Sequence, residues 1–413
     1  MRKRVVITGL GCISPLGNTV DEAWQALLAG KSGAGPITHF DASQHKTRFA
    51  CEVKNFDPAA LFGSREARRM DRFTQFALAA AQQALAHSGL DVNDSNRDRV
   101  GVVVGSGIGG IGTLSEQVGV MTEKGPDRVS PFLVPMMISD TAAGMAAIHL
   151  GVRGPNMAVV TACASGNNAI GEATEMIRRG AADAMLAGGA EAAIVPITIA
   201  GMNVMGALST RNDDPQAASR PFDKTRDGFV MGEGGVMLVI ESLEHARARG
   251  ANILAEISGY GTTDDAYHVS APAENGSGAA TCMKIAIEDA GLDVTEIGYI
   301  NAHGTSTPLN DKSETAAIKT VFGEQAYKVA VSSTKSMTGH MIGAAGAMEA
   351  MISTLVFQHN ILPATINYTD PDPNCDLDYI PNNSRVASPR HIMSNSFGFG
   401  GHNATLVFSR FGE

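Results

Sequence analysis

The chain repeats its own succession of strand, turn and helix, and this repeat restricts it to folds built from two related halves. Residues 158–163 (AVVTAC) align without a gap with residues 330–335 (AVSSTK). Eight residues beyond Cys163 and Lys335 lie Gly171 and Gly343, each inside a predicted helix of small residues. A supersecondary unit that recurs in this way indicates a duplicated α/β architecture.

Further strand pairs follow the same repeat. Apolar strands are predicted at residues 4–11 and 255–261, at 100–105 and 297–304, and at 235–241 and 403–409. The strands of the last pair are the final predicted strands of the first and the second half respectively. We therefore expect a first half at residues 1–250, which carries the candidate nucleophile, and a shorter second half at residues 251–413, which carries the candidate catalytic histidines.

The predicted elements indicate an α/β fold. Residues 73–88 and 279–290 show the apolar spacing of helices, and such helices alternate along the chain with the predicted strands. Residues 102–104, 184–189 and 236–240 are apolar without alternation, which is typical of strands covered by helices on both faces. Aromatic residues make up only 5% of the chain, so we expect the helices to pack on the sheets mainly through alanine and glycine.

Composition excludes several kinds of partner and site. A net charge of -10 argues against nucleic acid as a partner. The five cysteines are far apart, odd in number and without a CxxC pair, so the sequence predicts neither a disulfide framework nor a metal site. No apolar run is long enough to cross a bilayer. We expect a protein of the reducing cytoplasm that does not bind membranes.

Cys163 is a candidate nucleophile because of its position. It stands at the turn between a predicted buried strand and a predicted helix, where the unpaired N–H groups and the macrodipole of the helix favour the reactive thiolate. The small residues Ala162, Ala164 and Gly166 would let a substrate carbonyl approach the sulfur. A free cysteine can also be a small buried apolar residue. The two interpretations can be distinguished by whether other parts of the chain supply catalytic partners for Cys163.

Two histidines of the second half supply such partners. His303 follows a predicted strand in the segment NAHGTSTPLND, and His340 precedes the helix that mirrors the one after Cys163. A single histidine is most often a satisfied surface or core residue. Two histidines in small polar loops at strand ends, related by pseudo-symmetry to a cysteine, are the groups that acyl transfer needs.

Four motifs of the chain resemble those of the β-ketoacyl-[acyl-carrier-protein] synthases, and most closely those of the synthase II subgroup of dissociated fatty acid synthesis. They are TACASG (161–166), NAHGTST (301–307), KSMTGH (335–340) and NSFGFGG (395–401), to which the stretch STRNDDPQAASRPFD (209–223) can be added. The resemblance extends from the first strand to Phe408. One departure is Asn168, where relatives often have histidine, and it puts only the exact subgroup in doubt.

The resemblance implies a fold, an activity and partners. The fold would be thiolase-like, with five layers in the order αβαβα and two pseudo-symmetric halves. The activity would be a decarboxylative Claisen condensation of malonyl carrier with an acyl group held on Cys163, which elongates fatty acids. The partners would be an acyl carrier protein and a second copy of the chain in a homodimer. The enzyme would need no cofactor of its own, because the substrates are carried on the phosphopantetheine of the carrier protein.

The resemblance also implies roles for the site residues. Cys163 would accept the acyl chain, with its own N–H and that of Phe399 as the oxyanion hole. His303 and His340, as neutral imidazoles, would assist decarboxylation by stabilising the enolate.

Lys335 resembles the lysine that the family places near the histidines. We expect an ion pair with Asp311, Glu314 or Glu349 that is structural and also holds the imidazoles neutral.

Substrate contacts follow from the same resemblance. Thr305 and Thr307 resemble the hydroxyls that bind the phosphopantetheine arm, and Phe399 resembles a gate between flexible glycines. An apolar tunnel would bury the acyl chain at about 0.8 kcal/mol per methylene. Its candidates, for which core packing is the alternative interpretation, are Ile108, Leu133, Met202 and Met205.

A cluster of arginines stands out in this acidic chain. Arg65, Arg68, Arg69 and Arg72 occupy what is predicted to be one exposed helix. The resemblance implies that an acidic carrier docks there. From the residues alone, a solvated helix face accounts for the cluster equally well.

Other activities fit parts of the pattern. A degradative thiolase shares the fold and the nucleophile but needs a second cysteine near the C-terminus, and residues 395–403 contain none. A non-catalytic chain-length factor would lack Cys163. A ketosynthase of a polyketide pathway has the same motifs, although a free-standing chain without fused modules favours the fatty acid enzyme.

Overall fold

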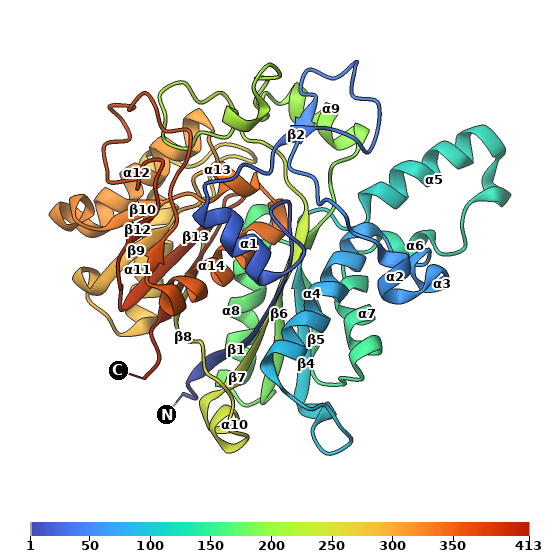
Figure 1. Ribbon diagram of the computed structural model, residues 1–413, viewed down its shortest axis with the longest axis horizontal. Helices are drawn as coiled ribbons and strands as arrows, with labels where there is room; N and C mark the ends of the chain where they lie inside the picture. Colours follow the sequence, from blue (N-terminus) through green and yellow to red (C-terminus); the bar gives the residue numbers. More distant parts are fainter. Residues whose placement is uncertain (1, 413) are drawn as a thin grey trace.

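Ten strands form one hydrogen-bonded sheet in which the five strands of each half lie together (Figure 1). The computed structural model describes residues 2–412. In spatial order the strands are β5 (Asn156–Val159), β4 (Val100–Gly105), β6 (Ala184–Glu191), β7 (Gly234–Ser242), β1 (Val5–Ile13), β8 (Ala255–Asp264), β14 (His402–Ser409), β13 (His391–Phe397), β9 (Ile297–Asn301) and β10 (Ala330–Ser332). The order is mirrored about its centre, and β1, β4, β5 and β7 mirror β8, β9, β10 and β14, as the repeat predicts.

A short ladder joins the two halves. Strands β1 and β8 run antiparallel and pair from Val5 with Ile257 to Ile7 with Ala255. Because β1 also pairs with β7 along its length, the two five-stranded halves become one sheet that curls around the helices between them.

The helices complete five layers in the predicted order αβαβα. The inner layer consists of α8 (Ser165–Arg178) and α14 (Ala345–His359), each of which contacts strands of both halves. On the outer faces, α4 (Arg72–Ser88) and α7 (Thr141–Leu150) cover the first half, and α11 (Ser277–Ala290) and α12 (Pro308–Phe322) belong to the second. The thiolase-like layering expected from the sequence is confirmed.

Small residues let the two inner helices touch. A Cβ added at Gly166 would lie 2.8 Å from the backbone nitrogen of Ala347, and one added at Gly346 would lie 2.6 Å from Oδ1 of Asn167. Real Cβ atoms do not approach so closely, so both positions require glycine. Close packing of this kind leaves no room for an aromatic side chain at either position.

The predicted helices and strands obey ordinary local rules. Helix α4 begins after Asp71, whose side chain accepts the N–H of Phe73 at 3.2 Å, and it ends at Gly89 in the left-handed conformation (φ 61°). The strand before Cys163 differs from the prediction. It ends at Val159, and it is half-exposed rather than buried because β5 is the edge strand of the sheet.

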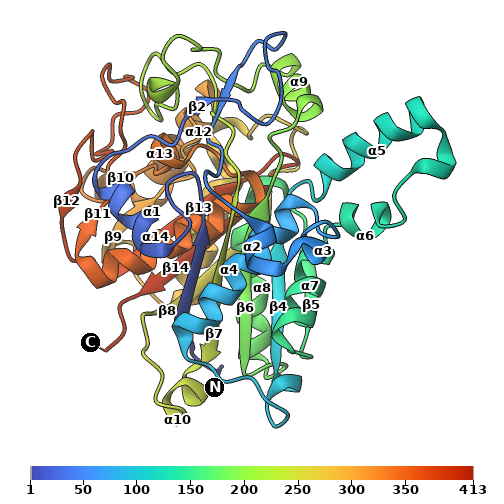
Figure 2. The same cartoon turned by 45° about the vertical axis from the view of Figure 1, so that its right-hand side comes forward.

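The remaining elements lie outside the layers described above. The helices are α1 (Val20–Leu28), α2 (Pro58–Phe62), α3 (Ser64–Ala67), α5 (Ile111–Lys124), α6 (Leu133–Met137), α9 (Pro196–Val204), α10 (Leu243–Ala248) and α13 (Lys335–Thr338), and the short strands are β2 (Gly35–Pro36), β3 (Phe49–Ala50), β11 (Ile361–Leu362) and β12 (Arg385–Val386). Figure 2 shows that α5 and α6 form an arm that projects from the body. Among residues 2–412, no helix has both the length and the apolar character needed to cross a membrane.

Candidate active site

Cys163 lies at a sharp turn between the sheet edge and the inner helix layer. Ala162 adopts the left-handed conformation (φ 49°), and α8 begins at Ser165. The Ser165 hydroxyl holds the turn, because it accepts the N–H of Thr161 at 2.9 Å and donates to the carbonyl of Ala162 at 2.7 Å. The thiol is therefore presented at the start of a helix, as predicted, and Cys163 is 7% exposed.

The second half contains the same turn, but the counterpart of Cys163 is Gly343 and not Lys335. Ile342 takes the left-handed conformation (φ 46°) one residue before Gly343, as Ala162 does before Cys163. The short helix α13 is inserted between β10 and this turn. The gapless alignment that pairs Cys163 with Lys335 is therefore wrong beyond the strands.

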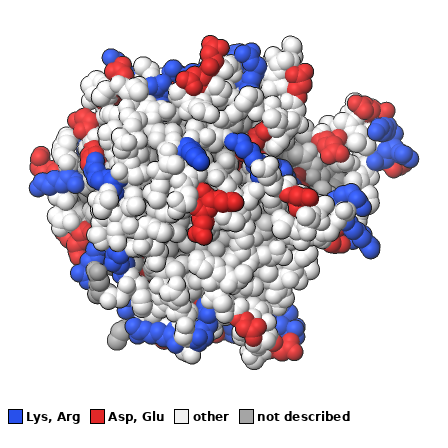
Figure 3. All heavy atoms as spheres, in the orientation of Figure 1, with Lys and Arg blue, Asp and Glu red and all other residues white. Residues whose placement is uncertain are grey.

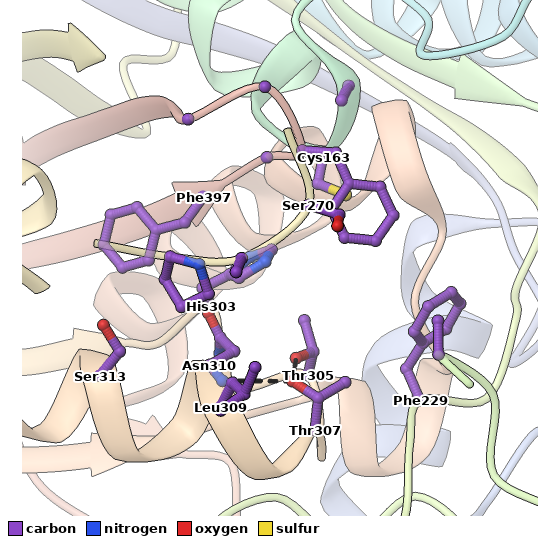
Figure 4. Close-up of a pocket in the computed structure, with 18 of the residues that line it drawn as sticks. Cys163, Phe229, Ser270, His303, Thr305, Thr307, Leu309, Asn310, Ser313 and Phe397 are labelled. Atoms are coloured by element: carbon purple, nitrogen blue, oxygen red, sulfur yellow. Dashed lines mark hydrogen bonds between the residues drawn. The ribbon is translucent and has the colours of Figure 1, made fainter. Parts of the chain in front are cut away.

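His340 and His303 converge on Cys163 from the second half, and Figure 4 shows His303 beside the cysteine. Nε2 of His340 lies 2.9 Å from Sγ of Cys163. The centroids of the two imidazoles are 5.4 Å apart, with an interplanar angle of 86°, and one ligand atom of each of the three residues lies within 4.8 Å of the others. The structure thus brings together the three side chains that the sequence singled out.

The backbone of His303 is held by Glu314. This carboxylate, on α12, accepts the N–H of His303 at 2.8 Å and that of Gly304 at 2.7 Å, and it also accepts a hydrogen bond from the Asn395 amide at 3.2 Å. Burial raises the pKa of Glu314 to about 7, although the N–H donors act in the opposite direction. Glu314 therefore positions the histidine loop and does not form the ion pair with Lys335.

Lys335 pairs with Glu349. Both residues are 1% exposed, and Nζ of Lys335 donates to Oε1 of Glu349. The third expected carboxylate, Asp311, instead accepts the N–H groups of Phe222 and Ser306. Of the three partners that the sequence left open, the tertiary structure selects Glu349.

The surroundings of both imidazoles favour the neutral form. Burial lowers the pKa of His303 and of His340 well below the usual value of 6.5, and the charge of Lys335 lowers each of them further. Desolvation, as the main cause, and the lysine, as the second, thus both act toward the neutral state expected from the sequence.

Burial of Cys163 opposes the thiolate that its place at a helix N-terminus favours. Burial raises the pKa of the Cys163 thiol to about 12, although Lys335 and the N–H groups of Phe399 and Cys163 act in the lowering direction. Desolvation of the sulfur thus outweighs the helix N-terminus. A thiol in contact with a neutral imidazole can transfer its proton to His340 as it attacks, so His340 is placed to act as general base.

Phe399 contributes its backbone to the site. Its N–H and that of Cys163 both act to lower the pKa of the Cys163 thiol. The loop fits closely, because a Cβ added at Gly398 would lie 2.7 Å from the carbonyl of Thr161, and Gly400 has a positive φ of 90°. This geometry fits an oxyanion hole made by the two N–H groups, whereas a gating motion of the Phe399 ring stays a prediction.

A cavity of about 550 Å³ leads to Cys163 (Figure 4). Thr305 and Thr307 line it, with their hydroxyl oxygens 3.0 Å apart. Of the four tunnel candidates, Ile108, Met202 and Met205 lie on its wall. Leu133 does not line this cavity, because it lies on the projecting arm in α6.

Sequence reasoning missed several residues of the cavity. Phe397 and Phe229 lie edge-on to the histidines, with centroids 5.6 Å from His303 and 5.3 Å from His340 respectively. Phe397 stands in the NSFGFGG motif, so position alone could have found it. Phe229 carries no local signal, because only tertiary folding brings it to the site. Other lining residues without an assigned role are Asp265, His268, Asn310 and Ile342.

The four arginines of the predicted docking surface do not share one helix. Arg65 lies on α3, Arg68 follows it, and Arg72 begins α4. Arg72 is held by the buried carboxylate of Glu233, with Nη2 2.8 Å from Oε1, and Arg69 is half-buried. Arg65 and Arg68 are exposed, and Lys and Arg side chains gather in the region of α3, below the projecting arm (Figure 3).

Comparisons with known proteins agree with this site. The model of the β-ketoacyl synthase N-terminal domain matches residues 2–246, and that of the C-terminal domain matches residues 254–369. The chain belongs to the β-ketoacyl synthase family. It is 53% identical over 410 residues to 3-oxoacyl-[acyl-carrier-protein] synthase 2 of Synechocystis sp. and 53% identical over 409 residues to that of Coxiella burnetii, with 99% of each chain covered.

Solved structures show the same fold for this synthase. A β-ketoacyl synthase from Burkholderia phymatum is 40% identical with a TM-score of 0.93, over 99% of this chain and 100% of the other. The ishigamide ketosynthase/chain length factor is 38% identical with a TM-score of 0.94, and all of both chains is covered. A type II polyketide ketosynthase, solved in complex with its acyl-carrier protein, is 36% identical with a TM-score of 0.92, again over all of both chains.

The same three side chains of this synthase also have the donor types of a zinc site. Histidines that bind metals usually have their second ring nitrogen held by a carboxylate or a carbonyl. Within residues 2–412, neither Nδ1 of His303 nor Nδ1 of His340 has a hydrogen-bond partner. The arrangement therefore favours proton transfer over metal binding, and the absence of a metal stays a prediction.

Proposed function

We propose that this chain is a 3-oxoacyl-[acyl-carrier-protein] synthase, an acyltransferase that elongates fatty acids by decarboxylative Claisen condensation. The observation that carries the proposal is the contact between Cys163 and His340, with His303 beside them, at a cavity of suitable size. The relatives at 53% identity, each named 3-oxoacyl-[acyl-carrier-protein] synthase 2, support the same activity.

In the first half-reaction Cys163 takes the acyl group from the carrier. The sulfur forms a new bond to the thioester carbon, and the thiol proton passes to Nε2 of His340. The carrier sulfur then leaves as its own C–S bond breaks, and it takes that proton. The N–H groups of Cys163 and Phe399 would stabilise the oxyanion, for which one donor is typically worth about 10²–10³-fold in rate.

In the second half-reaction malonyl carrier supplies the nucleophile. The bond to its free carboxylate breaks, CO₂ leaves, and the electron pair forms an enolate whose oxygen accepts hydrogen bonds from His303 and from His340 in the tautomer that carries its proton on Nε2. The enolate carbon attacks the acyl carbonyl, the bond to Cys163 breaks, and the released thiolate takes a proton from solvent. Neutral imidazoles suit this step, because they donate hydrogen bonds without a fixed charge.

No cofactor is part of this proposal. Every bond change involves only the two substrates, the three side chains and solvent. The phosphopantetheine of the carrier would enter along the cavity wall at Thr305 and Thr307, whose hydroxyls offer hydrogen bonds to its amides. We also propose a cytoplasmic location, because free thiols such as the five cysteines here suit a reducing compartment.

A condensation assay tests the function. Purified protein incubated with acyl carrier and malonyl carrier should release CO₂ and form a 3-oxoacyl carrier extended by one malonyl-derived unit. A polyketide ketosynthase is the alternative, which the likeness to two polyketide-type structures supports. Repeated extension without reduction would favour that alternative, and no condensation with any acyl carrier would contradict both.

The acyl carrier protein is the proposed partner of the exposed arginines. A net charge of -10 repels an acidic carrier at long range, so a local basic surface must recruit it. Reversing Arg65 and Arg68 to glutamate should raise the KM for carrier-bound substrates by about tenfold and weaken the salt dependence of association. Reaction with small pantetheine thioesters should stay unchanged in steady-state assays.

The double variant Arg247→Glu, Lys328→Glu is the matched control for docking. Both side chains are exposed and lie on other elements, and the change in net charge is the same. Equal loss with carrier-bound and carrier-free substrates would mean that Arg65 and Arg68 support the fold or the site.

A second copy of the chain is the proposed partner of β5. This strand is the edge of the sheet, with its outer N–H and C=O groups unpaired in the single chain, and exposed apolar side chains surround it, including Met157, Val160 and Ile148. Antiparallel pairing of β5 with its copy about a two-fold axis would cover both. Leu133 lies on the neighbouring arm, so a tunnel role for it would require this second copy.

Met157→Asp should convert the dimer to a monomer at micromolar concentration, because it places a charge in the proposed interface. Sedimentation velocity measures the change. Ile285→Asp is the control, since Ile285 is similarly exposed (38% against 40%) but lies on α11, away from β5. A wild-type monomer would contradict the dimer.

A further inference from the structure

Glu191 is a buried carboxylate for which the mechanism above has no use. It ends β6 and is fully buried. Its Oε2 accepts the N–H of Gly107 at 2.7 Å and that of Gly343 at 3.1 Å. Its Oε1 accepts the hydroxyl of Ser106 at 3.0 Å and the N–H of Ile108 at 3.3 Å. Among residues 2–412 no cation pairs with it, so all four contacts are neutral donors from two distant segments.

These contacts clamp two walls of the cavity together. Ile108 lines one wall, and Ile342, directly before Gly343, lines the other. The segments lie so close that a Cβ added at Gly343 would be 2.4 Å from the nitrogen of Gly107 and 2.9 Å from Oε2 of Glu191. The carboxylate thus sits between two N–H groups that would otherwise face each other unpaired.

A buried carboxylate also holds the backbone beside the histidine in the second half, although it comes from a helix and not from a strand end. Glu314 accepts two successive N–H groups just after β9, and one of them belongs to His303. Glu191 accepts two successive N–H groups just after β4, the counterpart of β9, and one of them belongs to Ile108. In each half a buried carboxylate fixes the backbone of a residue that faces the cavity.

The cost of burying Glu191 supports a positioning role. Burial raises its pKa to about 7, against the lowering effect of the N–H and hydroxyl donors. A buried carboxylate without a cation is expensive, and a neutral side chain of similar size could fill the same space. A glutamine in this place would have one oxygen for the N–H groups of Gly107 and Gly343, but its NH₂ group would then face the N–H of Ile108, which Oε1 of Glu191 accepts.

We propose that Glu191 is a positioning residue of the acyl pocket. By clamping the segments that carry Ile108 and Ile342, it holds both side chains against the acyl chain on Cys163 and so sets the preference for long over short chains. This inference rests on the proposed function, because it needs an acyl group on Cys163.

Glu191→Gln tests the proposal, since it keeps the size but turns an NH₂ group toward N–H donors. Acylation of Cys163 by a series of pantetheine thioesters, from butanoyl to hexadecanoyl, is followed by intact-mass spectrometry. We expect the rate with the best long chain to fall by about 100-fold, as for a misplaced binding wall. The loss with butanoyl thioester should be far smaller, and the decarboxylation of malonyl thioester should change little. The charge of Glu191 also raises the pKa of the Cys163 thiol, but its removal acts on every chain length alike.

The outcomes separate the inference from the function. Acylation of the wild type at no chain length would contradict the proposed function itself. Equal losses at all chain lengths in Glu191→Gln would overturn the positioning role and leave the function intact. Ser106→Ala, which removes one of the four donors, should show the same dependence on chain length with a smaller loss of acylation rate. If Glu191→Gln does not fold, an unchanged pattern in Ser106→Ala overturns the inference.

Discussion

Replacement of Cys163 by serine is expected to abolish acyl-enzyme formation and to lower the condensation rate by about 10⁴-fold or more. The proton of a hydroxyl is far harder to remove than that of a thiol, and a neutral His340 is the base available at 2.9 Å. The pKa of the Cys163 thiol is already raised by burial. A serine hydroxyl in the same place is a still weaker acid, so we do not expect His340 to remove its proton. Intact-mass spectrometry after incubation with acyl carrier measures the adduct.

Cys282→Ser is the matched control for this change. Cys282 is also fully buried, on α11, and its thiol donates to the carbonyl of Gly261 at 3.2 Å. This variant should form the acyl adduct as the wild type does. A stable acyl group on any cysteine other than Cys163 in the wild type would remove Cys163 from its role.

Replacement of His303 by alanine is expected to separate the two half-reactions. Transfer of the acyl group to Cys163 should largely continue, because His340, and not His303, is hydrogen-bonded to the sulfur. Decarboxylation of malonyl carrier should fall by about 10²–10⁴-fold, since a hydrogen bond to the developing enolate is lost. Acyl-enzyme formation is followed by mass spectrometry, and decarboxylation by release of CO₂.

His391→Ala is the control for the loss of a buried imidazole. His391 lies at the start of β13, away from the cavity, and its Nδ1 is 2.8 Å from the hydroxyl of Ser409. The His391→Ala variant should lower the stability of the fold and leave the rates of the two half-reactions in their normal ratio. If His303→Ala slowed both half-reactions equally, the division of labour between His303 and His340 would be wrong.

The layered fold could be predicted from the sequence because its signals are local and repeated. Unbroken apolar strands such as residues 102–104 predict a sheet covered on both faces, and β4 and its mirrored partner β9 occupy the expected places. The alignment failed where the halves differ by an insertion, at α13, because a gapless comparison cannot register an added turn. It therefore paired Cys163 with Lys335, whereas the structure pairs it with Gly343.

Some residues of the candidate site could also be predicted from the sequence, and others could not. Cys163, His303 and His340 could be found because each stands in a small, polar or glycine-rich turn at a predicted strand end, and parallel strands bring such turns to one edge. The resemblance assigns Leu133 to the tunnel and Arg72 to the docking surface, and the structure puts neither of them there in the single chain. One lies on the projecting arm and the other binds the buried Glu233, and neither fact leaves a trace in the neighbouring sequence.

The sequence by itself determined the two-fold repeat, the α/β layering and the trio of Cys163, His303 and His340, because these depend on periodicity and on residues at the ends of local elements. Only the tertiary structure decided that Lys335 pairs with Glu349 and that burial raises the pKa of the Cys163 thiol against the effect of the helix N-terminus. Both outcomes depend on desolvation and on the approach of groups far apart in the chain, which exist only after the layers have packed.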